Sequence, residues 1–235
     1  MTPILFYGVP AGCSFGSIVA LEWLGRPYRL CRIEMPRVVT SAAFKRINPL
    51  GETPALLTAG GAILREGLAI TSHLGGGGVE QGLAFAHGTR EHDRFTQMLA
   101  FLNTSFFHSF GPLWYAYEHE LAPDAKAALT EYGRAKVQKA HTDLEAMLGT
   151  QRWLLGDHRT LVDAYFAGLA RWADYHGIDR RAFPNLQRLV EQLEADPGVR
   201  FAHAIEAQRP AVSAGGFAGE ITLDEALASI ERAAA

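Results

Sequence analysis

The sequence predicts two units, an α/β domain followed by an all-helical domain. Short apolar segments alternate with helical segments over about the first eighty residues, which is typical of a layered α/β fold. Residues 75–89 are rich in glycine, and the apolar periodicity after them is helical almost to the end. We therefore expect an α/β domain at residues 1–76, a linker at 77–89, and an all-helical domain with a C-terminal tail at 90–235.

Length and composition fit one soluble globular protein. The chain has 235 residues, of which 48% are hydrophobic, so it can bury a sizeable core. Its formal net charge is −3 without a long basic run, so we do not expect a nucleic-acid partner. No apolar run reaches the ~20 residues of a membrane span, and no leader segment is evident. We expect no membrane association, a cytoplasmic location, no metal, and free thiols at Cys13 and Cys31.

The first unit is predicted to run strand, helix, strand, helix, two strands and helix. An apolar strand at 4–7 is broken by the glycine- and proline-containing stretch 8–12. The helix after it ends at Gly25, a residue favoured at helix C-termini. A second strand follows at 28–35, and a short helix at 40–47 completes this part of the pattern.

The segment 48–71 predicts a β-hairpin that leads into a helix. Pro54 stands at a strand start, where its missing amide hydrogen costs least. Two glycines at 60–61 separate two short apolar runs, which is a hairpin signal. Glu66 would then lie near a helix N-terminus, where anions are favoured. By itself the hairpin could equally be ordinary sheet structure, with Glu66 only capping its helix.

The second unit shows helical spacing in most of its length. We expect the glycines at 75–78 to be too flexible to hold a helix and to form part of the linker. A long apolar face over 95–117 predicts a helix bent at Pro112, and a partner helix is predicted at 125–148. Thr160 and Asp163 form a capping-box pattern that opens an apolar helix. Further helices are predicted at 184–193, 197–205 and 223–233, and residues 210–221 are predicted to be a surface loop.

Five stretches resemble motifs of the glutathione transferase superfamily. Residues 47–56, Ile-Asn-Pro-Leu-Gly-Glu-Thr-Pro-Ala-Leu, are similar to its N-P-x-G-x-V-P-x-L segment, and residues 65–70 to its E-S-x-A-I segment. Residues 156–163 resemble the buried capping box of its helical domain. Pro-Ala-Gly-Cys-Ser at 10–14 resembles the P-G-A-C-S opening of the bacterial beta class, and 101–113 resembles the first long helix of that class. The resemblance covers residues 4–205 and implies a thioredoxin-like first domain.

The resemblance also implies a glutathione site on the first domain. A cis Thr53–Pro54 bond would turn the Thr53 backbone toward the extended peptide, which could pair with it like an added strand. Glu66 would bind the free amine, while the Gly67 amide donates to the γ-glutamyl carboxylate. Gly67 stands where the family usually has Ser, and Glu52 stands where many relatives are neutral. We therefore expect weak glutathione affinity or a modified thiol substrate.

The resemblance places the catalytic groups at Cys13, Ser14 and His108. A helix N-terminus would lower the pKa of the Cys13 thiol. Cys13 would either form a mixed disulfide with glutathione or, with Ser14, hydrogen-bond the glutathione sulfur; alternatively, it is only a small residue packed behind a strand. His108 would face the site, and Phe107 and Trp114 would line the electrophile pocket. Cys31 is expected to be an inert core thiol.

Taken together, the resemblance implies a homodimeric, beta-like glutathione transferase, a detoxification enzyme with glutathione as co-substrate. It would join the glutathione thiolate to a small hydrophobic electrophile. Two alternatives stay open. One is a glutathione-dependent thiol-disulfide oxidoreductase that uses Cys13, and the other is a non-catalytic binding protein of the same fold, motivated by Gly67 and Glu52.

Overall fold

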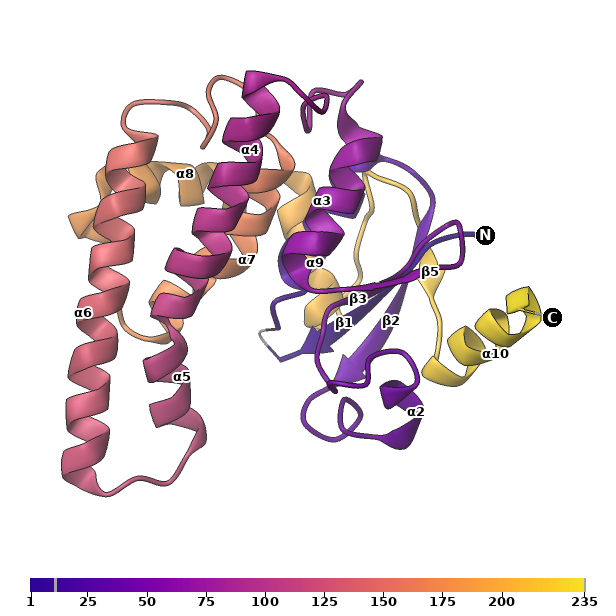
Figure 1. Cartoon of the computed structure of the whole chain (residues 1–235), viewed down its shortest axis with the longest axis horizontal. Helices are drawn as coiled ribbons and strands as arrows, with labels where there is room; N and C mark the ends of the chain where they lie inside the picture. The colour runs from indigo at the N-terminus through magenta and orange to yellow at the C-terminus, as the bar shows by residue number, and fades with distance from the viewer. Residues whose placement is uncertain (11, 235) are drawn as a thin grey trace.

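The computed structural model describes residues 1–10 and 12–234 and shows a mixed β-sheet beside a group of helices (Figure 1). Ala11, which belongs to the 10–14 motif, lies outside the described residues. The strands are β1 (Ile4–Val9), β2 (Tyr28–Glu34), β3 (Ala55–Leu57), β4 (Ile63–Arg65) and β5 (Phe217–Glu220). The helices of the first unit are α1 (Phe15–Leu24), α2 (Ala42–Lys45) and α3 (Gly67–Gly78). The later helices are α4 (Arg90–Phe101), the π-helix η1 (Leu102–Phe107), α5 (Gly111–Glu118), α6 (Pro123–Leu148), α7 (Leu161–Tyr175), the 3-10 helix η2 (Arg180–Ala182), α8 (Pro184–Glu194), α9 (Pro197–Glu206) and α10 (Leu223–Ala234).

The sheet has the strand order β4-β3-β1-β2-β5. β1 pairs in parallel with β2 and antiparallel with β3, and β3 pairs antiparallel with β4. Side chains alternate between the two faces of β1, as strand geometry requires. Leu5, Tyr7 and Val9 join the core shared with α1 and α7, whereas Ile4 and Phe6 join a second core formed with α2 and α10. This is the thioredoxin-like arrangement that the family resemblance implied.

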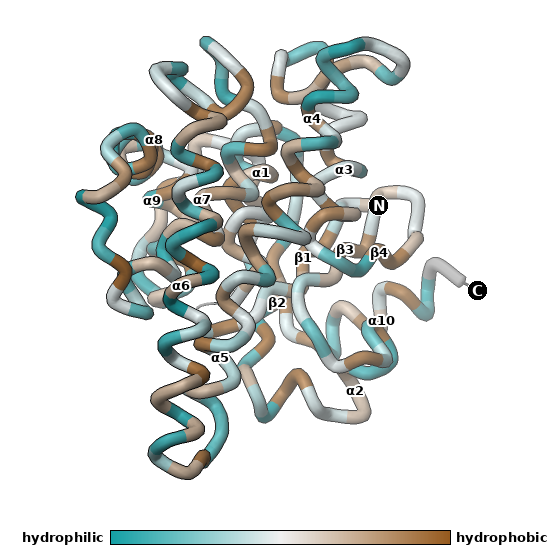
Figure 2. Tube along the Cα trace, turned by 60° about the vertical axis from the view of Figure 1, so that its left-hand side comes forward, coloured by the Kyte–Doolittle hydropathy of each residue, from teal (hydrophilic) through white to brown (hydrophobic). Residues whose placement is uncertain are grey.

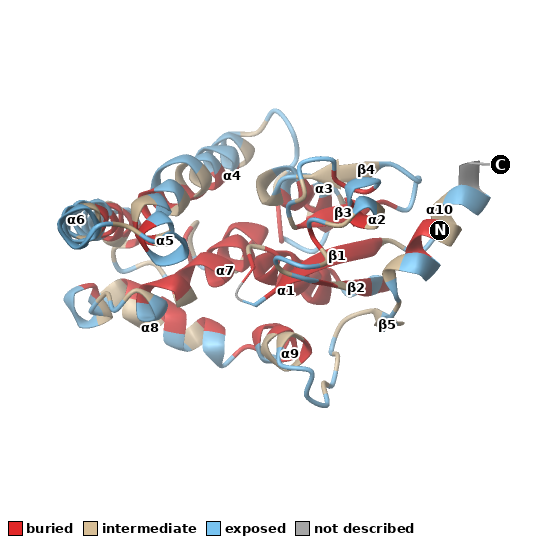
Figure 3. Cartoon of the chain, turned by 90° about the horizontal axis from the view of Figure 1, so that it is seen from below, coloured by how far each residue is buried: buried red, intermediate tan, exposed pale blue. Residues whose placement is uncertain are grey.

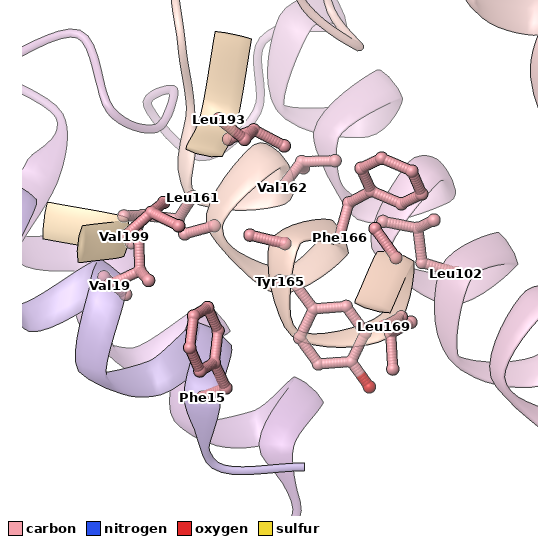
Figure 4. Packing of buried hydrophobic residues seen from close by; sticks show 14 of the residues in the cluster. Phe15, Val19, Leu102, Leu161, Val162, Tyr165, Phe166, Leu169, Leu193 and Val199 are labelled. Carbon is pink, nitrogen blue, oxygen red and sulfur yellow. The ribbon is translucent and has the colours of Figure 1, made fainter. Parts of the chain in front are cut away.

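The first unit and the helical unit share one hydrophobic core. The apolar segments of β1, α1 and α7 gather in the middle of the molecule (Figure 2), and these three elements are its most continuously buried parts (Figure 3). Glycines let α1 and α7 touch through their backbones. A Cβ on Gly16 would lie 2.5 Å from the Ala164 carbonyl oxygen, and a Cβ on Gly168 would lie 2.9 Å from the Gly16 nitrogen. The close packing fixes α7 against the start of α1 (Figure 4).

The glycine run at 75–78 is helical, so the expectation that it is too flexible for a helix is wrong. Leu74, Gly75 and Gly78 are buried on the inner face of α3. A Cβ on Gly75 would lie 3.3 Å from Ala84 Cβ, so the glycines make room for the chain that packs over the helix. Tertiary packing thus overrides the low helix propensity of glycine. The predicted boundary at residue 76 falls within α3, and the connection before α4 spans residues 79–89.

The C-terminal tail belongs to the sheet, which corrects the predicted surface loop at 210–221. β5 pairs in parallel with β2 and becomes the edge strand. α10, predicted as the last helix, packs on the α2 side of the sheet, where Ala226 and Leu227 are buried. Both chain ends therefore lie on the sheet side of the molecule (Figure 1). Four residues containing a glycine give little strand signal, so β5 could not be recognised from its own sequence.

The long helix expected at 95–117 is interrupted rather than simply bent. α4 widens into the π-helix η1, and α5 starts afresh with Pro112 in its first turn, where a missing amide hydrogen is tolerated. The capping box that begins α7 is confirmed, because the Thr160 amide donates to Asp163 Oδ2 at 2.8 Å. Asp163 is fully buried, and burial raises the pKa of its carboxyl group to about 6. Within the described residues, no helix is long and apolar enough to cross a membrane.

Candidate functional site

Three turns of the chain meet at one edge of the sheet, beside the start of α1. They are the segment that leads from the end of β1 to Cys13, the turn 51–54 before β3, and the junction 66–67 before α3. A Cβ on Gly8 would lie only 2.1 Å from Thr53 Oγ1, so glycine is needed for the first two turns to approach. Cys13, Thr53 and Glu66, which the sequence places far apart, therefore share one neighbourhood.

Thr53 presents an unused stretch of backbone at this edge. The Thr53–Pro54 bond is cis, as expected from the family resemblance. Among the described residues, the Thr53 N–H and C=O have no hydrogen-bond partner, while its hydroxyl points at Met35 Sδ, 3.8 Å away. An extended peptide could pair with these two free groups as an added strand does.

Glu66 is held in an unusual backbone conformation directly before α3. Its φ of 68° lies in the left-handed region, which non-glycine residues seldom adopt and which tends to occur at functional sites. The preceding Arg65 fixes the junction, because its guanidinium donates to the Ile47 carbonyl oxygen at 2.9 and 3.1 Å. The amides at the start of α3, beginning with Gly67, lack intrahelical partners and can donate to an anion.

The Cys13 thiol is more strongly affected by burial than by its position at the start of α1. Burial raises its pKa to about 11, while the Arg171 guanidinium acts in the opposite direction and Glu52 and Glu66 raise the pKa further. The expectation that a helix N-terminus would lower this pKa is therefore wrong. Cys13 is a protonated thiol at neutral pH. Cys31 is completely buried in β2, as predicted for a core thiol.

Ser14 serves the structure of the turn. It is fully buried, and its Oγ accepts a hydrogen bond from the Gly8 amide at 2.8 Å. The bond ties the start of α1 to the end of β1. A contact between this hydroxyl and the glutathione sulfur stays a prediction.

Arg171, on α7, is a site residue that the sequence reasoning missed. Its guanidinium donates to the Gly12 carbonyl oxygen at 2.7 Å, pairs with Glu206 at 2.5 and 3.0 Å, and lies over the Phe15 ring at 4.2 Å. It thus holds the turn that carries Cys13 and brings a positive charge near the thiol. Its only signal in the sequence was that it is the one basic residue of a mostly apolar helix.

The predicted site residues of the α4–α5 region are His108, Phe107 and Trp114. Among the described residues, no hydrogen bond, ion pair or ring contact joins any of them to Cys13. His108 is exposed, and its Nδ1 lies 2.9 Å from the Asn103 carbonyl oxygen. Trp114 packs in an aromatic cluster with Trp172 and His176, and Phe107 packs against Trp172. Their roles as catalytic histidine and electrophile pocket stay predictions.

A different cavity adjoins the Cys13 turn. It has a volume of about 450 Å³ and lies between the end of β2 and the end of α9. Pro10 and Met35 line it together with charged side chains, among them Arg32, Glu206 and Arg209. This cavity was not foreseen, because its walls come from distant parts of the chain.

Comparison with known proteins gives consistent matches over both units. Residues 12–75 match the model of the glutathione S-transferase N-terminal domain, and residues 99–197 match that of the C-terminal domain. The glutathione S-transferase GST-4.5 of Xanthomonas campestris pv. campestris is 28% identical over 83% of this chain and 95% of its own length.

Two solved structures extend the comparison. A sphingomonad glutathione S-transferase, solved in complex with glutathione, is 26% identical with a TM-score of 0.76, covering 87% of this chain and 98% of that one. The bacterial beta class glutathione S-transferase of Sphingomonas chungbukensis is also 26% identical with a TM-score of 0.76, covering 86% of this chain and 98% of that one.

Proposed function

This chain belongs to the glutathione transferase superfamily, and we propose that it is an enzyme that joins the glutathione thiolate to small electrophiles. The unpartnered Thr53 backbone beside Glu66 and the start of α3 carries the proposal. Glutathione needs a backbone clamp, an acidic group for its amine and donors for its γ-glutamyl carboxylate. The Thr53 backbone, the Glu66 carboxylate and the first amides of α3 can supply these three groups, because the pairing of β3 with β4 brings the two segments side by side.

In the proposed complex, the glutathione sulfur lies at the start of α1. There the positive end of the helix and the Arg171 guanidinium favour its thiolate form. Cys13, which stays protonated, can donate its S–H to that sulfur. In a displacement, the thiolate forms a carbon–sulfur bond while the leaving group departs with the bonding electron pair, and the thiol proton goes to solvent. Holding both reactants together supplies much of the rate.

The remaining parts of the proposal concern the second substrate, the oligomeric state, the cellular location and the biological role. We propose that the second substrate is a small hydrophobic electrophile that binds near Phe107 and Trp114. We also propose that the protein is a homodimer, that it is cytoplasmic and that it acts in detoxification. We further propose that His108 is a catalytic residue that faces the site. The homodimer can be checked by light scattering, and replacing Trp114 by Ala should raise KM for the electrophile more than KM for glutathione.

A direct assay tests the activity. Purified protein is given glutathione with a dinitro-substituted chlorobenzene, an epoxide and an isothiocyanate. We expect conjugation of at least one electrophile, and Glu66→Gln should raise KM for glutathione about tenfold, because it removes the charge that pairs with the amine. Glu52→Gln is the matched control and should leave KM unchanged or lower it, since it removes a carboxylate without an assigned partner in the ligand.

The assay also separates the two alternatives. A thiol-disulfide oxidoreductase would need a reactive Cys13 thiolate, which a pKa of about 11 disfavours. Cys13→Ala should therefore retain conjugation. If no electrophile reacts and calorimetry shows no heat with millimolar glutathione, the transferase proposal is wrong and the chain is a non-catalytic protein of this fold.

A further inference from the structure

We propose that the Tyr165 hydroxyl, supplied by the helical unit, takes the place of the hydroxyl that Gly67 lacks and donates to the γ-glutamyl carboxylate of glutathione. The inference rests on the proposed function, since it names a further binding residue of the same site. Tyr165 and Gly67 are almost a hundred positions apart in the chain, so neither suggests the other in the sequence.

The Tyr165 ring occupies the space beside Gly67. A Cβ built on Gly67 would lie 3.3 Å from Tyr165 Cε2 and 3.9 Å from the Tyr165 hydroxyl oxygen. A serine hydroxyl at position 67 would be attached to that same Cβ. The phenol oxygen lies 3.9 Å from the atom that would carry a serine hydroxyl, within reach of an anion bound at the start of α3.

The packing of α7 explains why Tyr165 is in this position. The capping box fixes the start of the helix, and the glycines at 16 and 168 let it press against α1. Tyr165 projects from this contact with its oxygen pointing away from Leu161 and Val162 (Figure 4). Burial is the main cause that raises the pKa of the Tyr165 hydroxyl, and the Glu66 carboxylate also raises it, so the hydroxyl lies within the electrostatic reach of the proposed amine-binding group.

The hydroxyl hydrogen can be redirected to a ligand. In the structure, Tyr165 Oη donates to Asn103 Oδ1 at 2.8 Å. A phenol O–H rotates about its C–O bond, and Asn103 is only half-buried, so water can replace the donor that its oxygen loses. Burial raises the pKa of Tyr165, so the hydroxyl keeps its proton at every working pH.

The arrangement also explains why position 67 is glycine. A serine Cβ at 3.3 Å from the ring would be crowded while the Tyr165–Asn103 bond holds the ring in place. We therefore expect Gly67 and Tyr165 to bind the γ-glutamyl carboxylate together. The weak glutathione affinity that was expected from Gly67 alone is then no longer expected.

Four variants test the proposal by isothermal calorimetry with two ligands, glutathione and the dipeptide cysteinylglycine, which lacks the γ-glutamyl group. We expect Tyr165→Phe to weaken glutathione binding about ten- to a hundredfold, the effect of losing a hydrogen bond to a charged group. Cysteinylglycine binding should stay within about twofold. Asn103→Ala removes the same hydrogen bond inside the protein but keeps the Tyr165 hydroxyl. It should therefore weaken glutathione binding much less than Tyr165→Phe does.

The double variant Gly67→Ser/Tyr165→Phe should recover most of the lost affinity, because the ring without its Asn103 bond can shift by the few tenths of an ångström that serine needs. Tyr132→Phe, which removes an exposed hydroxyl on α6, is the control and should match the parent protein. The proposal is overturned if Tyr165→Phe binds glutathione as the parent does, or if Asn103→Ala loses as much as Tyr165→Phe. If the unmodified protein binds no glutathione, the proposed function is wrong as well. If it binds glutathione but Tyr165→Phe binds equally well, only the proposal for Tyr165 is wrong.

Discussion

At the scale of single residues, the environment of a side chain decides its chemistry more than its local position does. Cys13 stands at a helix start, where a thiol pKa is ordinarily lowered, yet burial raises it to about 11. Arg171 lies near enough to act in the opposite direction without prevailing. The two effects can be weighed only when both the burial and the distant cation are known.

The Cys13 environment predicts the pH dependence of its alkylation. Below its pKa the thiolate fraction rises with pH, so the rate of reaction with iodoacetamide should increase about tenfold per pH unit between about pH 7 and pH 10. Mass spectrometry of timed samples, with Cys13→Ser to subtract any reaction at Cys31, measures this rate. A plateau near neutral pH would show that the thiol is already ionised in the free protein.

At the scale of elements, α3 shows how packing decides where glycine is required. Gly76 is exposed, and a Cβ added to it would meet no described atom within 4 Å. A Cβ on Gly78, in contrast, would lie 3.0 Å from Leu83 Cβ and 3.2 Å from Leu24 Cδ2. The first glycine only weakens the helix, while the second makes room for the connection to α4. The same helix therefore contains a replaceable and a required glycine.

This contrast predicts opposite effects of one substitution at two positions. Gly76→Ala should raise the free energy of unfolding by about 0.5–1 kcal/mol, because alanine has the higher helix propensity. Gly78→Ala should lower it by about 1 kcal/mol or more, because the added methyl crowds two leucines. Urea unfolding followed by circular dichroism measures both, and equal effects at the two sites would contradict the packing argument.

At the scale of the whole molecule, the C-terminal tail closes the sheet and is anchored by one buried carboxylate. Glu22, on α1, is only 5% exposed and accepts hydrogen bonds from the Tyr28 hydroxyl, the Ser213 hydroxyl and the amides of Ala214 and Gly215. β5 then covers the edge of β2, and Tyr7 donates to Glu220 at 2.5 Å. Both family models end before this tail, which starts after α9.

Removing residues 210–235 should therefore destabilise the whole protein. The truncation leaves Glu22 and Tyr28 without their tail partners and exposes the edge of β2, so we expect a loss of about 3 kcal/mol, or roughly 6–12 °C in Tm. An uncovered strand edge should also promote association. Differential scanning calorimetry and light scattering measure the two effects.

A variant that weakens only the surface of the tail is the control for the truncation. Glu231→Gln breaks the exposed ion pair with Arg46 and should change stability by less than about 1 kcal/mol. If the truncated chain is as stable as this variant, the tail is an appendage and the anchoring role of Glu22 is wrong.

The sequence by itself determined the order of the two units, most helices and the hairpin before α3. It also determined the capping box at Thr160 and the placement of Thr53, Glu66 and Gly67 on adjoining turns. These features depend on periodicity, turn residues and caps, which act over a few neighbouring residues. The family resemblance, which rests on such local motifs, was confirmed over both units.

Only the tertiary structure decided the features that depend on partners far along the chain. The glycine-rich end of α3 is helical because other segments cover it, and β5 is a strand because β2 offers it an edge. Arg171 reaches Gly12 across 159 positions, and Ser213 reaches Glu22 across 191. Burial, strand pairing and charge contacts of this kind arise when distant segments meet, so no local pattern encodes them.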